Sequence, residues 1–189
     1  HAQKLAKEQG KIYVSPYNDP QIIAGQGTLA IELLDQLPRL DVVYVSIGGG
    51  GLISGIGSVL KAFSPKTRVV GVSAKNSAEL AASIRAGKMV KVDHHETLAD
   101  GCAGGVDSDT ITLGLGSEVI DDLIDCSEQQ IKSGLQQIAW SEKMLVEGSA
   151  GLAYAAWQED AQKNKNKIST VVLCGANFDK ETLSPIVNS

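Results

Sequence analysis

The sequence predicts an α/β fold of three layers, in which helices cover both faces of a mostly parallel sheet. Short apolar runs rich in β-branched residues alternate with helical segments along the 189 residues. Such alternation is typical of parallel sheets built from strand–helix–strand units. A run of glycines also follows one expected strand directly, and open sheets of this class bind ligands at the carboxyl ends of their strands.

The first half of the chain supplies seven of the expected elements. Helices are expected at residues 1–8, 25–36, 52–63 and 77–86, and strands at residues 11–14, 41–46 and 68–73. The strand at 41–46 is predicted by its valines and the short strand at 11–14 ends at a Ser-Pro pair. Asn76 and Glu79 have the spacing of a capping box, which predicts the start of the fourth helix.

The second half continues the alternation after an irregular stretch at residues 88–105. Helices are expected at residues 110–120, 127–143, 151–163 and 179–187, and strands at residues 122–126 and 168–174. The last strand leads into Cys174-Gly175-Ala176-Asn177, a second polar, glycine-containing stretch at a strand end. The fold therefore places two candidate ligand-binding stretches at one edge of the sheet.

Composition narrows the range of partners. The net charge is -5 and the pI is about 5.2, which disfavours nucleic acid and anionic membranes as partners. No apolar stretch approaches the length of about 20 residues that spans a bilayer. Three cysteines lie far apart, which favours free thiols in a cytoplasmic protein over a disulfide framework or a zinc site.

The stretch from Ser46 to Leu52 carries four consecutive glycines between a strand and a helix. Bare glycine amides can converge on one point, and the following helix adds its positive end, so the stretch suits a phosphate group. A nucleoside-triphosphate loop would need a lysine where Ile56 stands. The spacing for a dinucleotide fails too, because Ile53 or Ser54 stands where its third glycine is required, and no acidic residue ends the strand at 68–73. A phosphate monoester without ribose, such as pyridoxal phosphate, remains, and a tight structural turn is the alternative.

Five stretches in order resemble the fold-type II pyridoxal-phosphate enzymes, the group of the serine/threonine dehydratases (threonine ammonia-lyases) and serine racemase. The stretches that carry the resemblance are residues 22–28, 45–53, 97–101, 146–151 and 172–177. The resemblance implies pyridoxal 5'-phosphate as cofactor and the carboxy-terminal portion of such an enzyme as the fold. It further implies that residues 1–14 are the last helix and strand of a small domain, and that residues 15–189 are the carboxy-terminal part of the large cofactor-binding domain.

The resemblance also implies site residues. Backbone amides bind the cofactor phosphate, and they belong to Gly48, Gly49, Gly50, Gly51 and Leu52. Gly101 passes close to the cofactor ring, and Cys174 faces the pyridine nitrogen as a neutral group. Glu147 lies near the cofactor and is a candidate for an acid/base role, with a carboxylate at a helix start as the alternative. The alternative role for Cys174 is that of a small hydrophobic residue buried in the core.

Departures from the family pattern shape the expected function. Glu79 is the one acid left where racemase-like members hold a divalent ion, so it is only a weak metal candidate. His94, His95 and Glu96 are expected to be solvated loop residues. No lysine stands in the family's Schiff-base motif, which lies upstream of the glycine loop, so the chain is expected to need the missing amino-terminal half and to be inactive alone.

The function implied is a lyase that dehydrates L-threonine or L-serine to a 2-oxo acid and ammonia, in a homodimer. Serine racemase or another β-eliminating lyase is the alternative within the family. A non-catalytic phosphate-binding module is the alternative of another class. The sequence leaves the choice of substrate, effectors and oligomeric state open.

Overall fold

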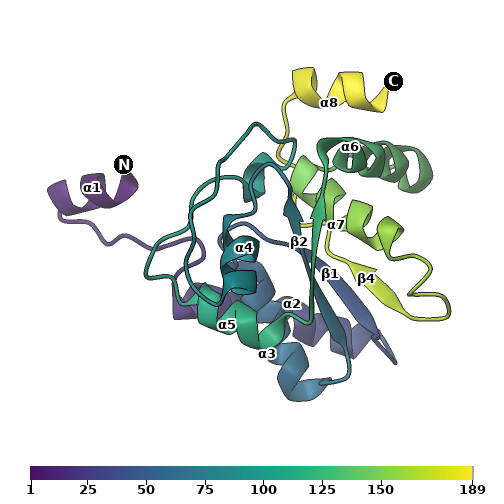
Figure 1. Cartoon of the computed structure of the whole chain (residues 1–189), viewed down its shortest axis with the longest axis horizontal. Coiled ribbons are helices and arrows are strands. Elements are labelled where there is room, and N and C mark those ends of the chain that lie inside the picture. The colour runs from purple at the N-terminus through teal and green to yellow at the C-terminus, as the bar shows by residue number, and fades with distance from the viewer. Residues whose placement is uncertain (189) are drawn as a thin grey trace.

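The computed structural model describes residues 1–188 and shows a four-stranded parallel sheet between two layers of helices (Figure 1). The strands lie in the order β3-β2-β1-β4. Their bounds are Val42–Ser46 (β1), Arg68–Ala74 (β2), Asp122–Cys126 (β3) and Ser169–Val171 (β4). The predicted three-layer α/β class is confirmed.

Eight α-helices are formed by the described residues. They are α1 (Ala2–Glu8), α2 (Pro20–Gln36), α3 (Gly51–Phe63), α4 (Glu79–Ala86), α5 (Thr112–Val119), α6 (Glu128–Gln137), α7 (Gly148–Glu159) and α8 (Lys180–Val187). A short 3-10 helix spans Asp100–Cys102, and one π-helical turn, Ile138–Glu142, extends α6.

The two faces of the sheet bury separate hydrophobic cores because successive strand residues point to opposite sides. Val42 and Tyr44 of β1 pack with α6, α7 and α8. Val43 and Val45 pack on the other face with α2, α3, α4 and α5. All five residues of β1 are buried, so the glycine loop that follows it extends from the rigid centre of the sheet.

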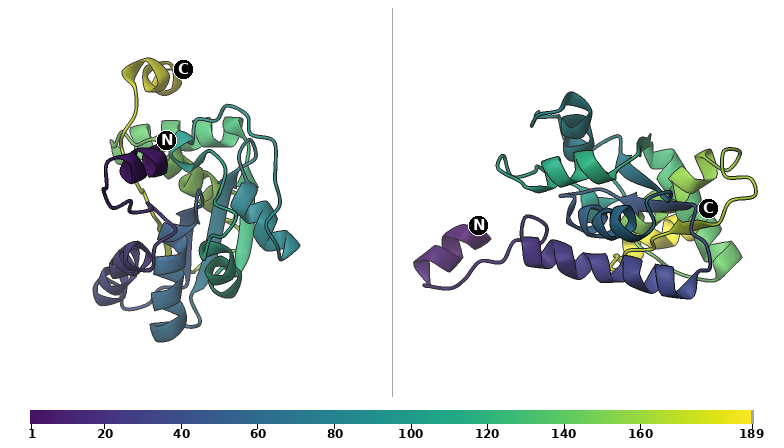
Figure 2. Two further views of the ribbon diagram at one scale, coloured as in Figure 1. Left: turned by 90° about the vertical axis from the view of Figure 1, so that its left-hand side faces the viewer. Right: turned by 90° about the horizontal axis from the view of Figure 1, so that it is seen from below.

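The strand expected at residues 11–14 is wrong. These residues form no strand, and Ile12 and Val14 are 91% and 55% exposed. A β-branched pattern needs a neighbouring strand, and this stretch has none among residues 1–188. Figures 1 and 2 show α1 standing away from the sheet at the end of this extended segment, and no residue of α1 is buried.

Several element ends differ from the prediction for local reasons. Helix α2 begins at Pro20, because the Asp19 side chain accepts hydrogen bonds from the amides of Gln21 and Ile22 at 2.8 and 3.2 Å and proline suits the first helical position. Helix α7 spans Gly148–Glu159 instead of 151–163, and β4 is confined to Ser169–Val171 instead of 168–174.

The capping box expected from Asn76 and Glu79 does not form. Ala78 is the N-cap of α4 and no side chain caps the helix. Asn76 instead donates to the carbonyl of Glu96 at 2.6 Å, and Glu79 is buried at 3% exposure. A capping box does form at α6, where Ser127 and Gln130 bond reciprocally.

Candidate cofactor site

The glycine loop joins the buried end of β1 to the first turn of α3. Gly50 has φ 86°, a left-handed conformation, and it is the N-cap of α3 without any side-chain cap. A Cβ at Gly50 would lie 2.4 Å from Leu80 Cδ2, and one at Gly49 would lie 2.2 Å from the Tyr17 ring. Glycine is therefore required here both by backbone conformation and by close packing.

The amides of this loop are free of protein partners. Within residues 1–188, no hydrogen bond to another protein group is made by the amides of Gly48, Gly49, Gly50, Gly51 and Leu52. They lie where the positive end of α3 adds its partial charge. Uncommitted donors at a helix start form an anion site, and this distinguishes the loop from a turn whose glycines serve packing alone.

The loop lines one cavity together with the other residues that the sequence singles out. This cavity has a volume of about 310 Å³ and its wall includes Gly48, Gly49, Gly50, Gly51, Leu52, Gly101, Glu147 and Cys174. The wall also includes residues that were not predicted as site residues from the sequence, namely Pro16, Tyr17, Ser46, Cys102 and Ser149. Segments more than 100 residues apart in the chain thus meet at the carboxyl edge of the sheet.

Glu147 connects two of these segments. Its Oε2 accepts a hydrogen bond from the amide of Asn177 at 2.9 Å. A Cβ at Gly175 would lie 2.6 Å from the carboxylate, and one at Gly101 would lie 3.3 Å from Oε1. The carboxylate is therefore held between the loop at Gly101 and the loop after β4, although the residue is also the N-cap of α7.

The two cysteines of the cavity carry neutral thiols. Burial of the Cys174 thiol, with smaller contributions from Cys102 and Glu147, raises its pKa to about 12, even though part of the residue is exposed. Burial also raises the pKa of Cys102, and Glu147 and Asp100 add to that effect. Both thiols remain protonated at neutral pH, so each is an uncharged hydrogen-bond donor next to the Glu147 carboxylate.

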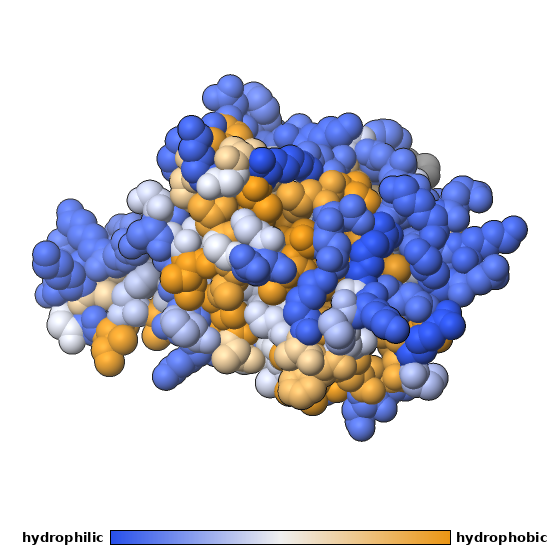
Figure 3. Space-filling view, turned by 60° about the horizontal axis from the view of Figure 1, so that its bottom comes forward, coloured by the Kyte–Doolittle hydropathy of each residue, from blue (hydrophilic) through white to orange (hydrophobic). Residues whose placement is uncertain are grey.

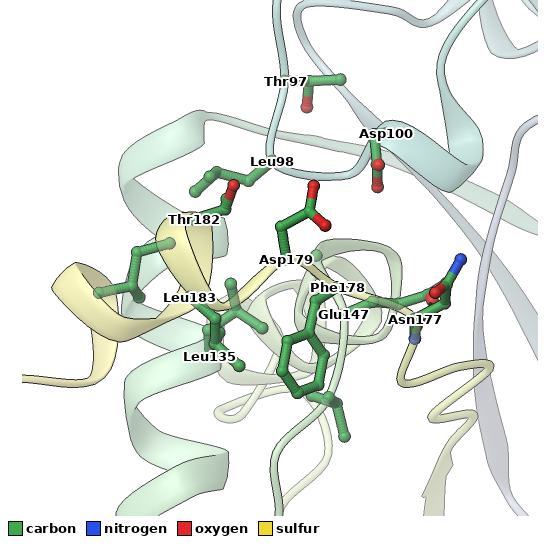
Figure 4. Close-up of a pocket in the computed structure, with 13 residues that line it drawn as sticks. Thr97, Leu98, Asp100, Leu135, Glu147, Asn177, Phe178, Asp179, Thr182 and Leu183 are labelled. Carbon is green, nitrogen blue, oxygen red and sulfur yellow. Dashed lines mark hydrogen bonds between the residues drawn. The ribbon is translucent and has the colours of Figure 1, made fainter.

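Glu147 also borders a second, smaller cavity of about 170 Å³. Figure 4 shows Asp100, Glu147, Asn177 and Asp179 around its polar side, and Leu98, Leu135 and Leu183 on its apolar side. Glu147 therefore lies between this cavity and the one that contains the glycine loop.

Comparison with known proteins identifies the family. A family model described as "Pyridoxal-phosphate dependent enzyme" matches residues 1–175. The chain belongs to this family. Pyridoxal 5'-phosphate is the cofactor of the family, and the free amides at the start of α3 together with the neutral Cys174 thiol fit its phosphate and its ring.

Relatives within the family are named as L-threonine ammonia-lyases and L-threonine dehydratases. The chain is 33% identical over 187 residues to an L-threonine ammonia-lyase of Thermotoga maritima, covering 99% of this chain and 46% of the relative. It is 35% identical over 185 residues to the catabolic L-threonine dehydratase of Escherichia coli, covering 97% of this chain and 56% of the relative. The chain thus spans about half the length of the curated relatives it matches.

Solved structures of the family share the fold. Threonine deaminase isoform 2 from Solanum lycopersicum superposes with a TM-score of 0.91 at 29% identity, covering 100% of this chain and 55% of that chain. Maize serine racemase gives a TM-score of 0.87 at 30% identity, covering 97% of this chain and 56% of that one. None of the helices formed by the described residues has the length and apolar character needed to cross a lipid bilayer.

Glu79, the weak metal candidate, contacts Lys91 and His94 in this member of the family. Its Oε1 accepts from Lys91 Nζ at 3.1 Å and from the Val106 amide at 3.0 Å, and its Oε2 lies 3.0 Å from His94 Nε2. Among residues 1–188 no group of three or more His, Cys, Asp or Glu side chains is arranged to hold a metal ion.

His94 lies in an exposed loop, as expected, but both of its ring nitrogens contact protein groups. Its Nδ1 lies 2.8 Å from the hydroxyl of Ser77, while its Nε2 faces Glu79. The Ser77 hydroxyl in turn accepts from the Gly104 amide at 3.0 Å. The sequence reasoning gave Glu79 a capping role and a weak metal role, so this cluster was not predicted.

Proposed function

We propose that this chain forms the phosphate-binding and ring-binding part of a pyridoxal-phosphate-dependent ammonia-lyase that converts L-threonine or L-serine to a 2-oxo acid and ammonia. The main support for this proposal is that the free loop amides line the same cavity as Gly101, Glu147 and the neutral Cys174 thiol. The names of the relatives, L-threonine ammonia-lyase and L-threonine dehydratase, support the choice of reaction.

Each part of the cavity has a defined task in this proposal. The amides of the glycine loop bind the phosphate group and fix its position relative to the sheet. Gly101 lets its backbone approach the ring, because a side chain there would meet Ser149 and Glu147. Pyridoxal phosphate, when bound, withdraws electrons from the α-carbon of the amino acid.

Cys174 sets how strongly the ring withdraws electrons. A neutral thiol cannot hold the pyridine nitrogen protonated as a carboxylate would, which favours expulsion of a β-hydroxyl over storage of negative charge. Glu147 is the candidate acid/base, since its carboxylate borders the cavity and is fixed by the Asn177 amide. The lysine to which family members attach the cofactor belongs, in this proposal, to a preceding segment.

The proposed domain division assigns residues 1–14 to a small domain and residues 15–189 to the large one. The separation of α1 from the sheet supports this division (Figure 2).

The proposed whole enzyme is a cytoplasmic homodimer. An apolar groove of about 420 Å³ between α2, α3 and α5 supports self-association, and Figure 3 shows apolar side chains gathered on one face of the molecule. Sedimentation equilibrium of the whole protein tests the dimer.

The reaction is tested with and without the amino-terminal half. The chain alone is expected to bind pyridoxal phosphate and to release no 2-oxo acid from serine or threonine. Joined to the segment that carries the family lysine, it is expected to release both 2-oxo acid and ammonia. Absence of product from both amino acids while the cofactor is bound would refute the lyase.

The same experiment separates the alternatives. The resemblance to maize serine racemase favours D-serine formation as the second candidate. The Lys91 ammonium beside Glu79 argues against a racemase that uses a divalent ion at this place. Measurement of D-serine with and without magnesium distinguishes the two. A natural full-length protein that binds the cofactor but converts no amino acid would instead support a non-catalytic phosphate-binding module.

A further inference from the structure

Ser149 is a buried serine of the cavity wall that has no role in the proposed chemistry so far. It is the second residue of α7, is 2% exposed, and lines the cavity beside Glu147 and Cys174. Among the described residues its Oγ has no hydrogen-bond partner. Buried hydroxyl groups are nearly always paired, so an unpaired one facing a cavity indicates a missing ligand atom.

The position of Ser149 along the cavity follows from a series of backbone contacts. Tyr17 packs against Gly49 and Gly51 of the phosphate loop, and Cys102 packs against Gly48. On the next segment, a Cβ at Gly101 would lie 2.8 Å from Ser149 Oγ. The Ser149 hydroxyl is therefore next to the Gly101 segment, where a Cβ would also lie 3.3 Å from Glu147 Oε1, while the Ser149 backbone carbonyl accepts a hydrogen bond from Ser46 at 2.6 Å. The hydroxyl, and not the backbone carbonyl, is the group of Ser149 that is left for a ligand.

The nearest protein group does not satisfy this hydroxyl. Ser149 interacts with the Cys102 thiol and lowers its pKa, but burial outweighs this contact and raises the pKa overall. The contact does not have the geometry of a hydrogen bond, and sulfur is a weak partner. The Ser149 amide, in the first turn of α7, likewise donates to no protein group among residues 1–188, so Ser149 has two uncommitted donors.

We propose that Ser149 is a hydrogen-bonding residue for the ring end of the cofactor, working beside Cys174. The ligand of Ser149 is a molecule with a pyridine ring and a phosphate monoester. The Ser149 hydroxyl donates a hydrogen bond to an acceptor atom on the ring side of that molecule. This inference rests on the proposed function of the cavity. It assigns to Ser149 a task separate from phosphate binding, which belongs to the loop amides.

The separation of tasks makes the proposal testable with two probes. Pyridoxal phosphate and inorganic phosphate are titrated into the 189-residue chain, with binding followed by calorimetry and by cofactor absorbance. Ser149→Ala is expected to weaken pyridoxal phosphate about five- to tenfold, the worth of one neutral hydrogen bond. Binding of inorganic phosphate is expected to stay unchanged, and Ser149→Thr to retain cofactor affinity.

Ser54 provides the matched control. Its hydroxyl is also buried and unpaired, but it lies in α3 and does not line the cavity. Ser54→Ala is therefore expected to leave the affinities for both probes unchanged. Equal pyridoxal-phosphate affinity in Ser149→Ala and the unaltered chain would overturn the inference, as would parallel weakening of both probes. If the unaltered chain binds neither probe, the proposed function itself fails, which is a distinct outcome.

Discussion

Gly50 shows how one residue serves both the fold and the cavity. Its positive φ begins α3 while its neighbours keep their amides uncommitted. The Leu80 methyl group and the Thr112 side chain fill the space where a Cβ would lie, at 2.4 and 3.0 Å. The conformation that exposes the amides is therefore fixed by packing from the opposite side, before any ligand arrives.

Gly50→Ala is expected to destabilise the chain by about 1–3 kcal/mol, because it combines a left-handed backbone with a steric clash. Urea denaturation followed by circular dichroism measures the loss. Gly25→Ala is the control, since Gly25 lies in α2 with nothing within 4 Å of its would-be Cβ. Alanine there is expected to be neutral or to stabilise by up to about 1 kcal/mol. Equal effects of the two substitutions would show that Gly50 is not constrained by its site.

At the scale of elements, the loop that carries Gly101 and Cys102 is held by the start of α4. Glu79 contacts Lys91, His94 and the Val106 amide, and these groups lie on both sides of Gly101 in sequence. Burial acts to raise the pKa of Glu79, but the hydrogen bonds from Val106, His94 and Lys91 outweigh it, so the pKa lies below its ordinary value. One buried carboxylate thus fixes a segment of the cavity wall.

Glu79→Gln is expected to destabilise the fold by about 1–3 kcal/mol at neutral pH, because it removes charge-assisted hydrogen bonds in a buried place. Since the folded pKa of Glu79 is depressed, its stabilisation is present above the unfolded pKa and is lost as pH falls through the folded pKa. As the pH falls below the ordinary pKa of a carboxyl group, the unaltered chain should therefore lose part of its free energy of unfolding, and the variant should lose less.

Hydrogen exchange of residues 91–106 measures the loosening of the loop. Glu96→Gln, on the exposed side of the same loop, is the control. An unchanged exchange pattern in Glu79→Gln would show that Glu79 does not hold the loop in place.

Sequence patterns predicted the elements whose signals are local. The valines of β1 and β2 mark strands that are buried on both faces, and Ser127 with Gln130 forms a capping box within four residues. The pattern at residues 11–14 failed because a strand also needs a partner. Gly48 and Cys174 were expected near strand ends, and Gly101 and Glu147 were named through the family resemblance. All four line one cavity. Tyr17, Cys102 and Ser149 were missed because their positions depend on segments that meet only in the folded chain.

At the scale of the whole molecule, a polar network joins the sheet to the segment after α7. The buried Tyr44 hydroxyl lies 3.0 Å from Asp160 Oδ2 and 3.1 Å from Arg68 Nη2, and it also contacts Asn164. Arg68 binds Asp160 as well, at 2.6 Å. Burial raises the pKa of Tyr44 to about 12, so its hydroxyl stays protonated. The network spans 116 residues of sequence between Tyr44 and Asp160, and it connects β1 and β2 to the turn that leads into β4.

Tyr44→Phe is expected to lower the free energy of unfolding of the whole chain by about 1–2 kcal/mol. The substitution preserves the ring within the core but removes the hydrogen bond that the Tyr44 hydroxyl donates to Asp160 and the one that it accepts from Asn164 Nδ2. Arg68 still bonds both residues, so the expected cost is that of buried hydrogen bonds lost from a network that otherwise remains. Tyr154→Phe is the matched control. Tyr154 is partly buried and stacks with Trp157 at a centroid distance of 5.2 Å, and the structure assigns no hydrogen bond to its hydroxyl. Loss of the Tyr154 hydroxyl is therefore expected to lower the free energy of unfolding by less than about 0.5 kcal/mol.

Denaturation followed by Trp fluorescence measures both variants. If Tyr44→Phe unfolds at the same urea concentration as the unaltered chain, the network does not hold the carboxy-terminal segment to the sheet. The edge of the sheet next to β1 would then depend on the three residues of β4 and on apolar packing alone.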